Sequence, residues 1–282
     1  MNESVVNFDC HSDRLIGILH QPLGAQNKIG VVIVVGGPQY RVGSHRQFTI
    51  MARAFAAAGY PTLRFDYRGM GDSEGEFKGF EYIDDDIKSA IDALVRESPK
   101  IDGVVLWGLC DAASACLIYA NQKDERVKGM ILANPWVRTA SGEAKAYIKH
   151  YYLQRVLQRS FWIKLFSGSF KFKKSIFKLL FLAKNSRVHS CGYSLIKNSY
   201  IDRMLAGFES SDLMFLFLIS DNDLTAKEFI EHTRNCVSWK NTISISKKSS
   251  HVLMEKSDHT FSSRDSLNSM VARCIEWIGC LH

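Results

Sequence analysis

The sequence predicts an α/β protein with a mostly parallel central sheet and flanking helices. Apolar, β-branched segments alternate with segments of helical periodicity, which implies right-handed βαβ units. Residues 29–35 form a continuous apolar run, as expected for a strand buried on both faces. Residues 103–115 (GVVLWGLCDAASA) read as a strand, a sharp turn and an alanine-rich helix. These observations together favour a doubly covered parallel sheet.

The first half of the chain carries most of the expected sheet. Two short apolar segments around a polar turn predict an antiparallel hairpin, and glycine- or proline-containing turns end the later elements. Residues 68–75 form a glycine-rich loop without strand or helix period. The expected elements are strands 5–8, 15–19, 29–35, 62–67, 104–107 and 129–133, and helices 45–58 and 80–96, with a further helix that follows the turn at 108–112 and continues through residue 119.

The alternation stops near residue 137 and resumes near residue 208. The segment 137–207 is helical, basic and aromatic, and it predicts a lid inserted at the carboxyl edge of the sheet, where ligands bind in open α/β folds. The expected organisation is a core of residues 1–136, a lid of residues 137–207, and a second part of the core at 208–282. The second part contains the expected strands 213–219 and 242–246 and helices 227–235 and 266–280.

Composition limits the classes of protein that fit. The 282 residues are 46% hydrophobic and 23% charged, which is ordinary for a soluble globular chain. The N-terminus lacks the pattern of a secretory signal, and no apolar run reaches the ~18 residues of a membrane span. Seven cysteines without metal-ligand spacing indicate a reducing compartment. We therefore expect a cytoplasmic protein with no disulfide framework, metal or cofactor.

The turn within 103–115 resembles a nucleophile elbow, in which a tight turn between strand and helix presents the nucleophile. The usual pattern is Gly-x-Ser-x-Gly, whereas this chain has Gly108, Cys110 and Ala112 at the three defined places. A helix N-terminus favours the ionised form of a cysteine. A small buried cysteine in an inert βα turn is the alternative interpretation.

An elbow nucleophile of this kind needs an acid after a later strand and a histidine near the C-terminus. Asp221 and Asp223 follow the strand expected at 213–219, and His259 precedes the last helix. The histidine would keep the thiol of Cys110 ionised, and the acid would orient the histidine. We prefer Asp223 because a few residues of turn are needed to bring the acid to the histidine, which leaves Asp221 as a turn or capping residue.

Three other histidines compete with His259 for the role of base. His20 and His45 come too early in the chain, and His251 follows the last expected strand too closely. Ser114 lies one turn into the helix after the elbow, so we interpret it as a packing residue.

Acyl transfer also needs donors for the oxyanion. One is expected to be the backbone N–H of Asp111, directly after the nucleophile. The second should come from the loop after strand 29–35, where Pro38 has no N–H. Gly37 or Gln39 must then donate, unless the glycine serves only to make the turn.

With these residues assembled, the chain resembles the α/β-hydrolase superfamily along most of its length. Residues 66–73 are similar to its D-x-R-G-x-G-x-S loop. More narrowly, the chain resembles the exosortase A system-associated hydrolase 1 family of bacteria. The segments that carry this resemblance are 36–48 (GGPQYRVGSHRQF), 64–75 (RFDYRGMGDSEG), 107–115 (WGLCDAASA), 134–139 (NPWVRT), 150–154 (HYYLQ) and 258–262 (DHTFS).

This resemblance implies the α/β-hydrolase fold, with Cys110, Asp223 and His259 at the positions of a catalytic triad. It also implies a bacterial setting of exopolysaccharide synthesis and protein sorting. The expected activity is cleavage of an acyl ester or thioester through a cysteinyl acyl-enzyme. An acyltransferase with the same triad and a non-catalytic binding protein on this fold are the alternatives.

The charge of the chain is concentrated in one segment. Residues 145–201 contain twelve Lys or Arg and no acid, so the remainder of a chain of net charge +7 carries −5. With twelve aromatic residues among them, these cations could recognise an acyl carrier protein or coenzyme A phosphates. A second possible partner is an anionic membrane surface, with apolar contacts from Tyr151, Phe161, Trp162 and Phe166. In the third interpretation the segment has no partner: its lysines are solvated and its aromatic side chains pack on the core. Nucleic acid is not expected, because no recognition motif accompanies the charge.

Overall fold

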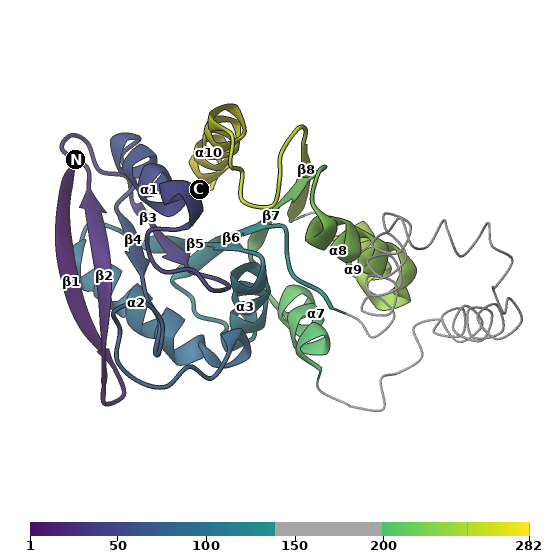
Figure 1. Ribbon diagram of the computed structural model, residues 1–282, viewed down its shortest axis with the longest axis horizontal. Helices are drawn as coiled ribbons and strands as arrows, with labels where there is room; N and C mark the ends of the chain where they lie inside the picture. Colours follow the sequence, from purple (N-terminus) through teal and green to yellow (C-terminus); the bar gives the residue numbers. More distant parts are fainter. Residues whose placement is uncertain (139–198, 247, 282) are drawn as a thin grey trace, which may run out of the picture.

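The computed structural model describes residues 1–138, 199–246 and 248–281. In this part of the chain, eight strands form one sheet in the order β1-β2-β4-β3-β5-β6-β7-β8. The first two strands form the predicted antiparallel hairpin, and β2 pairs with β4 in antiparallel fashion. The six strands β4, β3, β5, β6, β7 and β8 are parallel to one another (Figure 1). The strands are β1 (Asn2–Cys10), β2 (Asp13–Gln21), β3 (Ile29–Val34), β4 (Thr62–Phe65), β5 (Gly103–Leu109), β6 (Val127–Ala133), β7 (Met214–Ser220) and β8 (Ser249–Met254).

Helices cover both faces of this sheet, as the α/β prediction requires. Helices α1 and α10 contribute to one buried apolar cluster, and α2, α3, α7, α8 and α9 contribute to the other (Figure 1). The described helices are α1 (Gln47–Ala57), α2 (Asp84–Glu97), α3 (Asp111–Tyr119), α7 (Tyr200–Ser210), α8 (Leu224–Asn235), α9 (Val237–Ile245) and α10 (Arg264–Gly279), with 3-10 turns η1 (Ser44–Arg46), η2 (Phe80–Tyr82) and η3 (Ala120–Gln122).

The central strands are buried on both faces because their side chains alternate between the two clusters. In β3, Val31 and Ile33 pack with α1 and α10, whereas Val32 and Val34 pack on the opposite face. All seven residues of β5 are buried. The predicted α/β fold is therefore confirmed, and it places the ends of the parallel strands along one edge of the sheet.

One predicted strand is wrong. Residues 242–246 were expected to form the last strand because Thr-Ile-Ser-Ile-Ser alternates polar and apolar side chains. In the structure they end helix α9, and the last strand is β8, a few residues later. Trp239 anchors α9 through its ring contacts with Phe208 and Phe229, so tertiary packing overrides the local pattern.

The predicted lid, residues 137–207, lies mostly outside the described residues, so its boundaries stay a prediction. Helix α7 begins with a capping box between Ser199 and Asp202. It packs closely on α3, since a Cβ at Gly207 would lie 1.9 Å from the carbonyl oxygen of Leu117.

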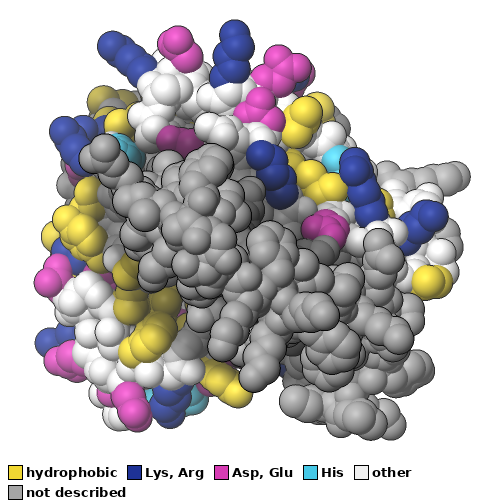
Figure 2. Space-filling view, turned by 45° about the vertical axis from the view of Figure 1, so that its right-hand side comes forward, with side chains coloured by type: hydrophobic (Ala, Val, Ile, Leu, Met, Phe, Trp, Pro, Cys, Tyr) yellow, Lys and Arg dark blue, Asp and Glu magenta, His cyan; other side chains and the backbone are white. Residues whose placement is uncertain are grey.

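The concentration of positive charge predicted for residues 145–201 also falls almost wholly outside the described part. Where side chains are coloured in Figure 2, Lys and Arg alternate with Asp and Glu along the upper rim of the face shown. The described surface in this view therefore has mixed charge.

Candidate active site

The turn after β5 has the geometry of a nucleophile elbow. Cys110 has φ 62° and ψ −123°, a sparsely populated conformation for a residue with a side chain, and it is the N-cap of α3. Its backbone N–H donates to the carbonyl of Ala133 over 2.9 Å, which ties the turn to β6. Gly108 is required here because a Cβ would lie 2.6 Å from the backbone of Ala112. The sequence thus forces a sharp turn that presents the thiol at the sheet edge.

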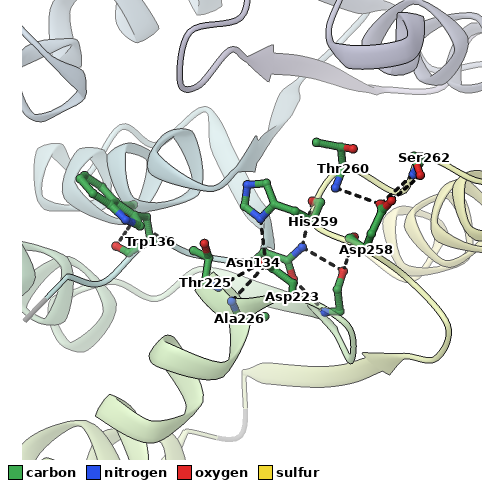
Figure 3. A network of polar contacts seen from close by, with 11 residues as sticks. Asn134, Trp136, Asp223, Thr225, Ala226, Asp258, His259, Thr260 and Ser262 are labelled. Carbon is green, nitrogen blue, oxygen red and sulfur yellow. Dashed lines mark hydrogen bonds and ion pairs between the residues drawn. The ribbon is translucent and has the colours of Figure 1, made fainter. Parts of the chain in front are cut away.

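The structure brings His259 and Asp223 together with this cysteine. His259 Nδ1 lies 2.8 Å from Asp223 Oδ2 (Figure 3). Hydrogen bonds to Asp223 and to Cys110 raise the pKa of His259 to about 10, against the opposing effect of burial. The carboxylate is almost fully buried, whereas 34% of the histidine side chain is exposed. The imidazole therefore lies between a buried negative charge and the thiol, with one side open to solvent.

Asp223 is held by the start of the next helix. As the N-cap of α8 it accepts the backbone N–H of Thr225 at Oδ1 and that of Ala226 at Oδ2, each over 3.1 Å. These bonds fix the carboxylate so that Oδ2 faces His259.

Asp221, the alternative acid, does not contact the histidine. Its two carboxylate oxygens accept the backbone N–H groups of Lys256 (2.9 Å) and Ser257 (3.1 Å). These donors lower the pKa of Asp221, and they tie the turn after β7 to the loop that carries the histidine.

The other candidate histidines lie elsewhere. His20 is fully buried on β2 and accepts a hydrogen bond from Arg64 Nε over 2.9 Å. His251 lies within β8, not after it, and its ring stacks on Phe217 with centroids 4.6 Å apart. His45 lies in η1 and acts electrostatically on Asp258. Of the four histidines considered, the one brought to Cys110 is His259.

The residues expected around the oxyanion lie on two loops that face each other. Asp111 is the first residue of α3, so its backbone N–H is one of the free donors at the helix N-terminus. Gly37 has φ 62° in the turn after β3, and its N–H acts on the side chain of Asp111. Gln39 uses its side-chain Oε1 to accept the N–H of Ser44 over 3.2 Å, so its side chain shapes the loop.

The glycine-rich loop after β4 supports the loop that carries Gly37. The buried carboxylate of Asp66 accepts the backbone N–H of Arg41 over 2.6 Å and also pairs with the Arg41 guanidinium. Gly71 has φ 53°, and a Cβ there would lie 2.1 Å from Asp66 Oδ2. The D-x-R-G-x-G-x-S motif therefore acts structurally, by holding the segment after β3 in place.

Two polar residues form hydrogen bonds at this edge that the sequence did not indicate. Asn134, at the end of β6, donates to Ser220 Oγ (2.9 Å) and to the carbonyl of His259 (3.1 Å) (Figure 3). Ser114, interpreted above as packing, donates to the carbonyl of Trp136 over 2.7 Å. The signal for Asn134 was an amide residue directly after a fully apolar strand, where a buried polar group must find partners.

Neither a metal site nor a membrane span is found in the part of the chain that the structure describes. In this part, no three His, Cys, Asp or Glu residues cluster in a way that could hold a metal ion. None of its helices combines the length and apolar character needed to cross a bilayer. Cys10, Cys110, Cys116, Cys274 and Cys280 are free thiols.

Comparison with known proteins agrees with the fold. The model of the α/β hydrolase fold matches residues 31–159, somewhat less than half of the chain. The Pyrococcus furiosus esterase Pf2001 has a similar structure, with a TM-score of 0.66 at 13% identity over 99% of this chain and 92% of that one. An α/β serine hydrolase homologue from Coxiella burnetii gives a TM-score of 0.58 at 15% identity over 99% and 98% of the two chains. The chain therefore has the α/β-hydrolase fold.

A similarity in sequence covers part of the chain. The quorum-quenching protein AidA of Acinetobacter baumannii is 31% identical over 136 residues, which are 46% of this chain and 43% of that protein. The chain thus spans less than half of the curated relative that it matches.

Proposed function

We propose that this protein hydrolyses an acyl ester or thioester through a cysteinyl acyl-enzyme on Cys110. The observation that carries the proposal is the set of three groups at this edge of the sheet: the strained elbow cysteine, His259, whose pKa Asp223 and Cys110 raise, and the buried carboxylate of Asp223, 2.8 Å from the histidine. A nucleophile, a base and an orienting acid in this order are what acyl transfer to a side chain requires. The esterase fold of the structural relatives is consistent with this chemistry.

The proposed reaction uses each residue at a stated atom. His259 holds the proton of Cys110, so that the sulfur attacks the acyl carbonyl carbon as a thiolate. The imidazolium then returns its proton to the leaving alcohol or thiol as the carbon–oxygen or carbon–sulfur bond breaks. Water, activated by the neutral imidazole, attacks the thioester on Cys110 and releases the acid. Asp223 stabilises the imidazolium in both halves of the reaction.

The first test is intact-mass spectrometry after incubation with a panel of acyl thioesters and activated esters. A mass increase that matches the acyl group, and that disappears in Cys110→Ala, supports the proposal. The complete absence of an adduct and of turnover across the panel would refute it.

A second test measures the thiolate without a substrate. We expect iodoacetamide to label Cys110 faster than Cys280, an exposed cysteine that serves as internal reference. His259→Ala should slow the labelling of Cys110. The matched control is His11→Ala. His11 is an exposed histidine that pairs with Asp85 over 2.9 Å, and it has no part in the proposed site. Equal labelling of both cysteines, unchanged by His259→Ala, would indicate an inert site.

The resemblance to the exosortase A system-associated hydrolase 1 family is part of this proposal, with bacterial exopolysaccharide metabolism as the setting. The basic segment 145–201, which lies almost wholly outside the described residues, would recognise an acyl carrier protein or an anionic membrane surface.

Product analysis with and without amine or hydroxyl acceptors distinguishes hydrolysis from acyl transfer, since both reactions would use the same three residues. Free acid as the sole product supports hydrolysis, whereas acylated acceptor would assign a transferase.

A further inference from the structure

The loop that carries His259 is tied to the sheet by two buried side chains, Asn134 at the end of β6 and Ser220 at the end of β7. The side-chain amide of Asn134 donates to the carbonyl of His259 over 3.1 Å and to Ser220 Oγ over 2.9 Å (Figure 3). Ser220 Oγ in turn donates to the carbonyl of Asp258 over 3.0 Å. Two consecutive carbonyls of the histidine loop are therefore bound by side chains of the sheet.

These two carbonyls belong to the peptide groups on either side of the His259 Cα atom. A peptide group is planar, so φ and ψ are the two soft dihedrals that set how the flanking groups and the Cα–Cβ bond are oriented. The bond to the carbonyl of Asp258 restricts rotation about φ of His259, and the bond to its own carbonyl restricts rotation about ψ. Together the two bonds fix the direction in which the imidazole leaves the loop.

The acid that the imidazole must meet is held by a different set of bonds. Two backbone N–H groups at the start of α8 donate to the carboxylate of Asp223. With the carboxylate fixed there, the 2.8 Å distance between Asp223 Oδ2 and His259 Nδ1 depends on the orientation of the histidine. Loss of the side chain of Asn134 or Ser220 is therefore expected to move the histidine and to leave the acid in place.

The chemistry of Asn134 suits this place. Its Oδ1 accepts the backbone N–H of Ser220 over 2.8 Å, while its two side-chain N–H groups donate to oxygen atoms. A carboxylate of the same shape has no N–H to offer the carbonyl of His259. The backbone of Asn134 has φ 44°, a left-handed conformation that asparagine adopts more readily than most residues. The residue type thus fits both its backbone conformation and its three bonds.

We propose that Asn134 and Ser220 are positioning residues that orient the imidazole of His259 towards Asp223. This inference rests on the proposed acyl transfer, in which His259 is the base. The two residues act through the backbone of the histidine and not on the acyl group. Their loss slows the reaction because the base is misplaced, and a displacement of about 1 Å can cost about 10²-fold in rate.

The direct test follows the imidazole of His259 by ¹⁵N NMR as the pH is varied. In the unaltered protein we expect a midpoint of about 10, with the hydrogen bond to Asp223 as the largest cause of the raised pKa. Asn134→Ala should lower this midpoint by about one pH unit or more, because a longer Nδ1–Oδ2 distance weakens a charged hydrogen bond. Ser220→Ala is a smaller change that keeps the bond from Asn134 to His259, so it should lower the midpoint less. An unchanged midpoint in both variants would overturn the proposal.

The matched control is Asn121→Ala. Asn121 also donates two side-chain hydrogen bonds, to the carbonyls of Ile118 (2.8 Å) and Arg203 (2.9 Å), but it lies in η3, at the opposite end of α3 from the elbow. Its loss should leave the midpoint of His259 unchanged. A fall as large as that in Asn134→Ala would show that general loosening of the protein moves the midpoint, and the positioning role would be lost.

Steady-state kinetics with an activated ester give the second readout. Asn134→Ala should lower kcat by about 10²-fold and leave KM nearly unchanged, because a misplaced base affects the chemical step and not the binding of the ester. A loss confined to KM would contradict the positioning role.

The NMR readout separates this inference from the proposed function, because it does not depend on catalysis. A midpoint near the ordinary value of 6.5 in the unaltered protein, or the absence of acylation on Cys110, would overturn the proposed function. A raised midpoint that both Asn134→Ala and Ser220→Ala retain would overturn the positioning role alone.

Discussion

The dual role of Asp223 gives a prediction that can be separated into two parts. Its carboxylate caps α8 and also pairs with His259. Asp223→Asn keeps a capping oxygen and removes the charge, whereas Asp223→Ala removes both. The free energy of unfolding should therefore fall in two steps that depend differently on pH.

The charge step follows from the pKa of His259, which is raised from 6.5 to about 10 with Asp223 as the largest cause. A folded-state pKa above the unfolded value stabilises the protein fully below pH 6.5 and loses this effect as the pH rises through about 10. The difference in stability between the unaltered protein and Asp223→Asn should thus be largest at pH 6 and disappear above pH 10. The capping step, from Asn to Ala, should cost about 1 kcal/mol at every pH in this range.

Urea unfolding of the three proteins at pH 6, 8 and 10.5 measures both steps. A difference between the unaltered protein and Asp223→Asn that stays constant over this range would refute the electrostatic coupling to His259. If Asp223→Asn and Asp223→Ala had the same free energy of unfolding, the capping role would be refuted. Both variants lack the carboxylate charge, and only Asp223→Ala also lacks the capping oxygen. The comparison of the two variants therefore measures the cap alone.

Three further changes test the elbow and its supports. Cys110→Ser should lower the acylation rate by about 10²-fold or more in single-turnover kinetics, because the site is built for a thiolate; full activity would contradict this. Asn134→Ala should lower the free energy of urea unfolding by about 1–3 kcal/mol, because it leaves the buried backbone N–H of Ser220 without its acceptor; a negligible change would argue against that role. Gly36→Ala should lower Tm more than Gly37→Ala, because a Cβ meets backbone atoms at 2.8 Å at the first position, whereas the second has open space and only the strain of φ 62°; equal shifts would contradict the tight packing.

The parts of the fold and of the site that follow local rules could be predicted from the sequence. The continuous apolar run at 29–35 indicated a strand buried on both faces, and all residues of β3 after Ile29 are buried. The chain order of the acid and the histidine behind Cys110 indicated which loops would meet, because parallel strands end at one edge of the sheet.

Features that depend on contacts between distant segments could not be predicted. The alternating pattern of residues 242–246 favoured a strand, but the helix is fixed by the burial of Trp239 among rings from α7 and α8. Asn134 and Ser220 are 86 positions apart, and a single sequence contains no local signal that pairs them. The same holds for the carboxyl group of Asp111, whose position over the loop after β3 follows from the sheet order.

The candidate site is held together by hydrogen bonds that link neighbouring loops. Asp66, after β4, binds the loop after β3, and Asp221, after β7, binds the loop after β8. Asn134, after β6, binds both Ser220 at the end of β7 and the backbone of His259. These pairs follow the spatial order of the strands, because strands in fixed register bring their carboxyl ends side by side.

This arrangement keeps the candidate site together across the long connection between β6 and β7. The chain leaves the sheet just after Asn134 and returns through α7 to the strand that ends at Ser220. The bonds between these two residues join the end of the strand before the connection to the end of the strand after it. These bonds help to hold the spacing between Cys110, which lies next to β6, and Asp223, which lies after β7.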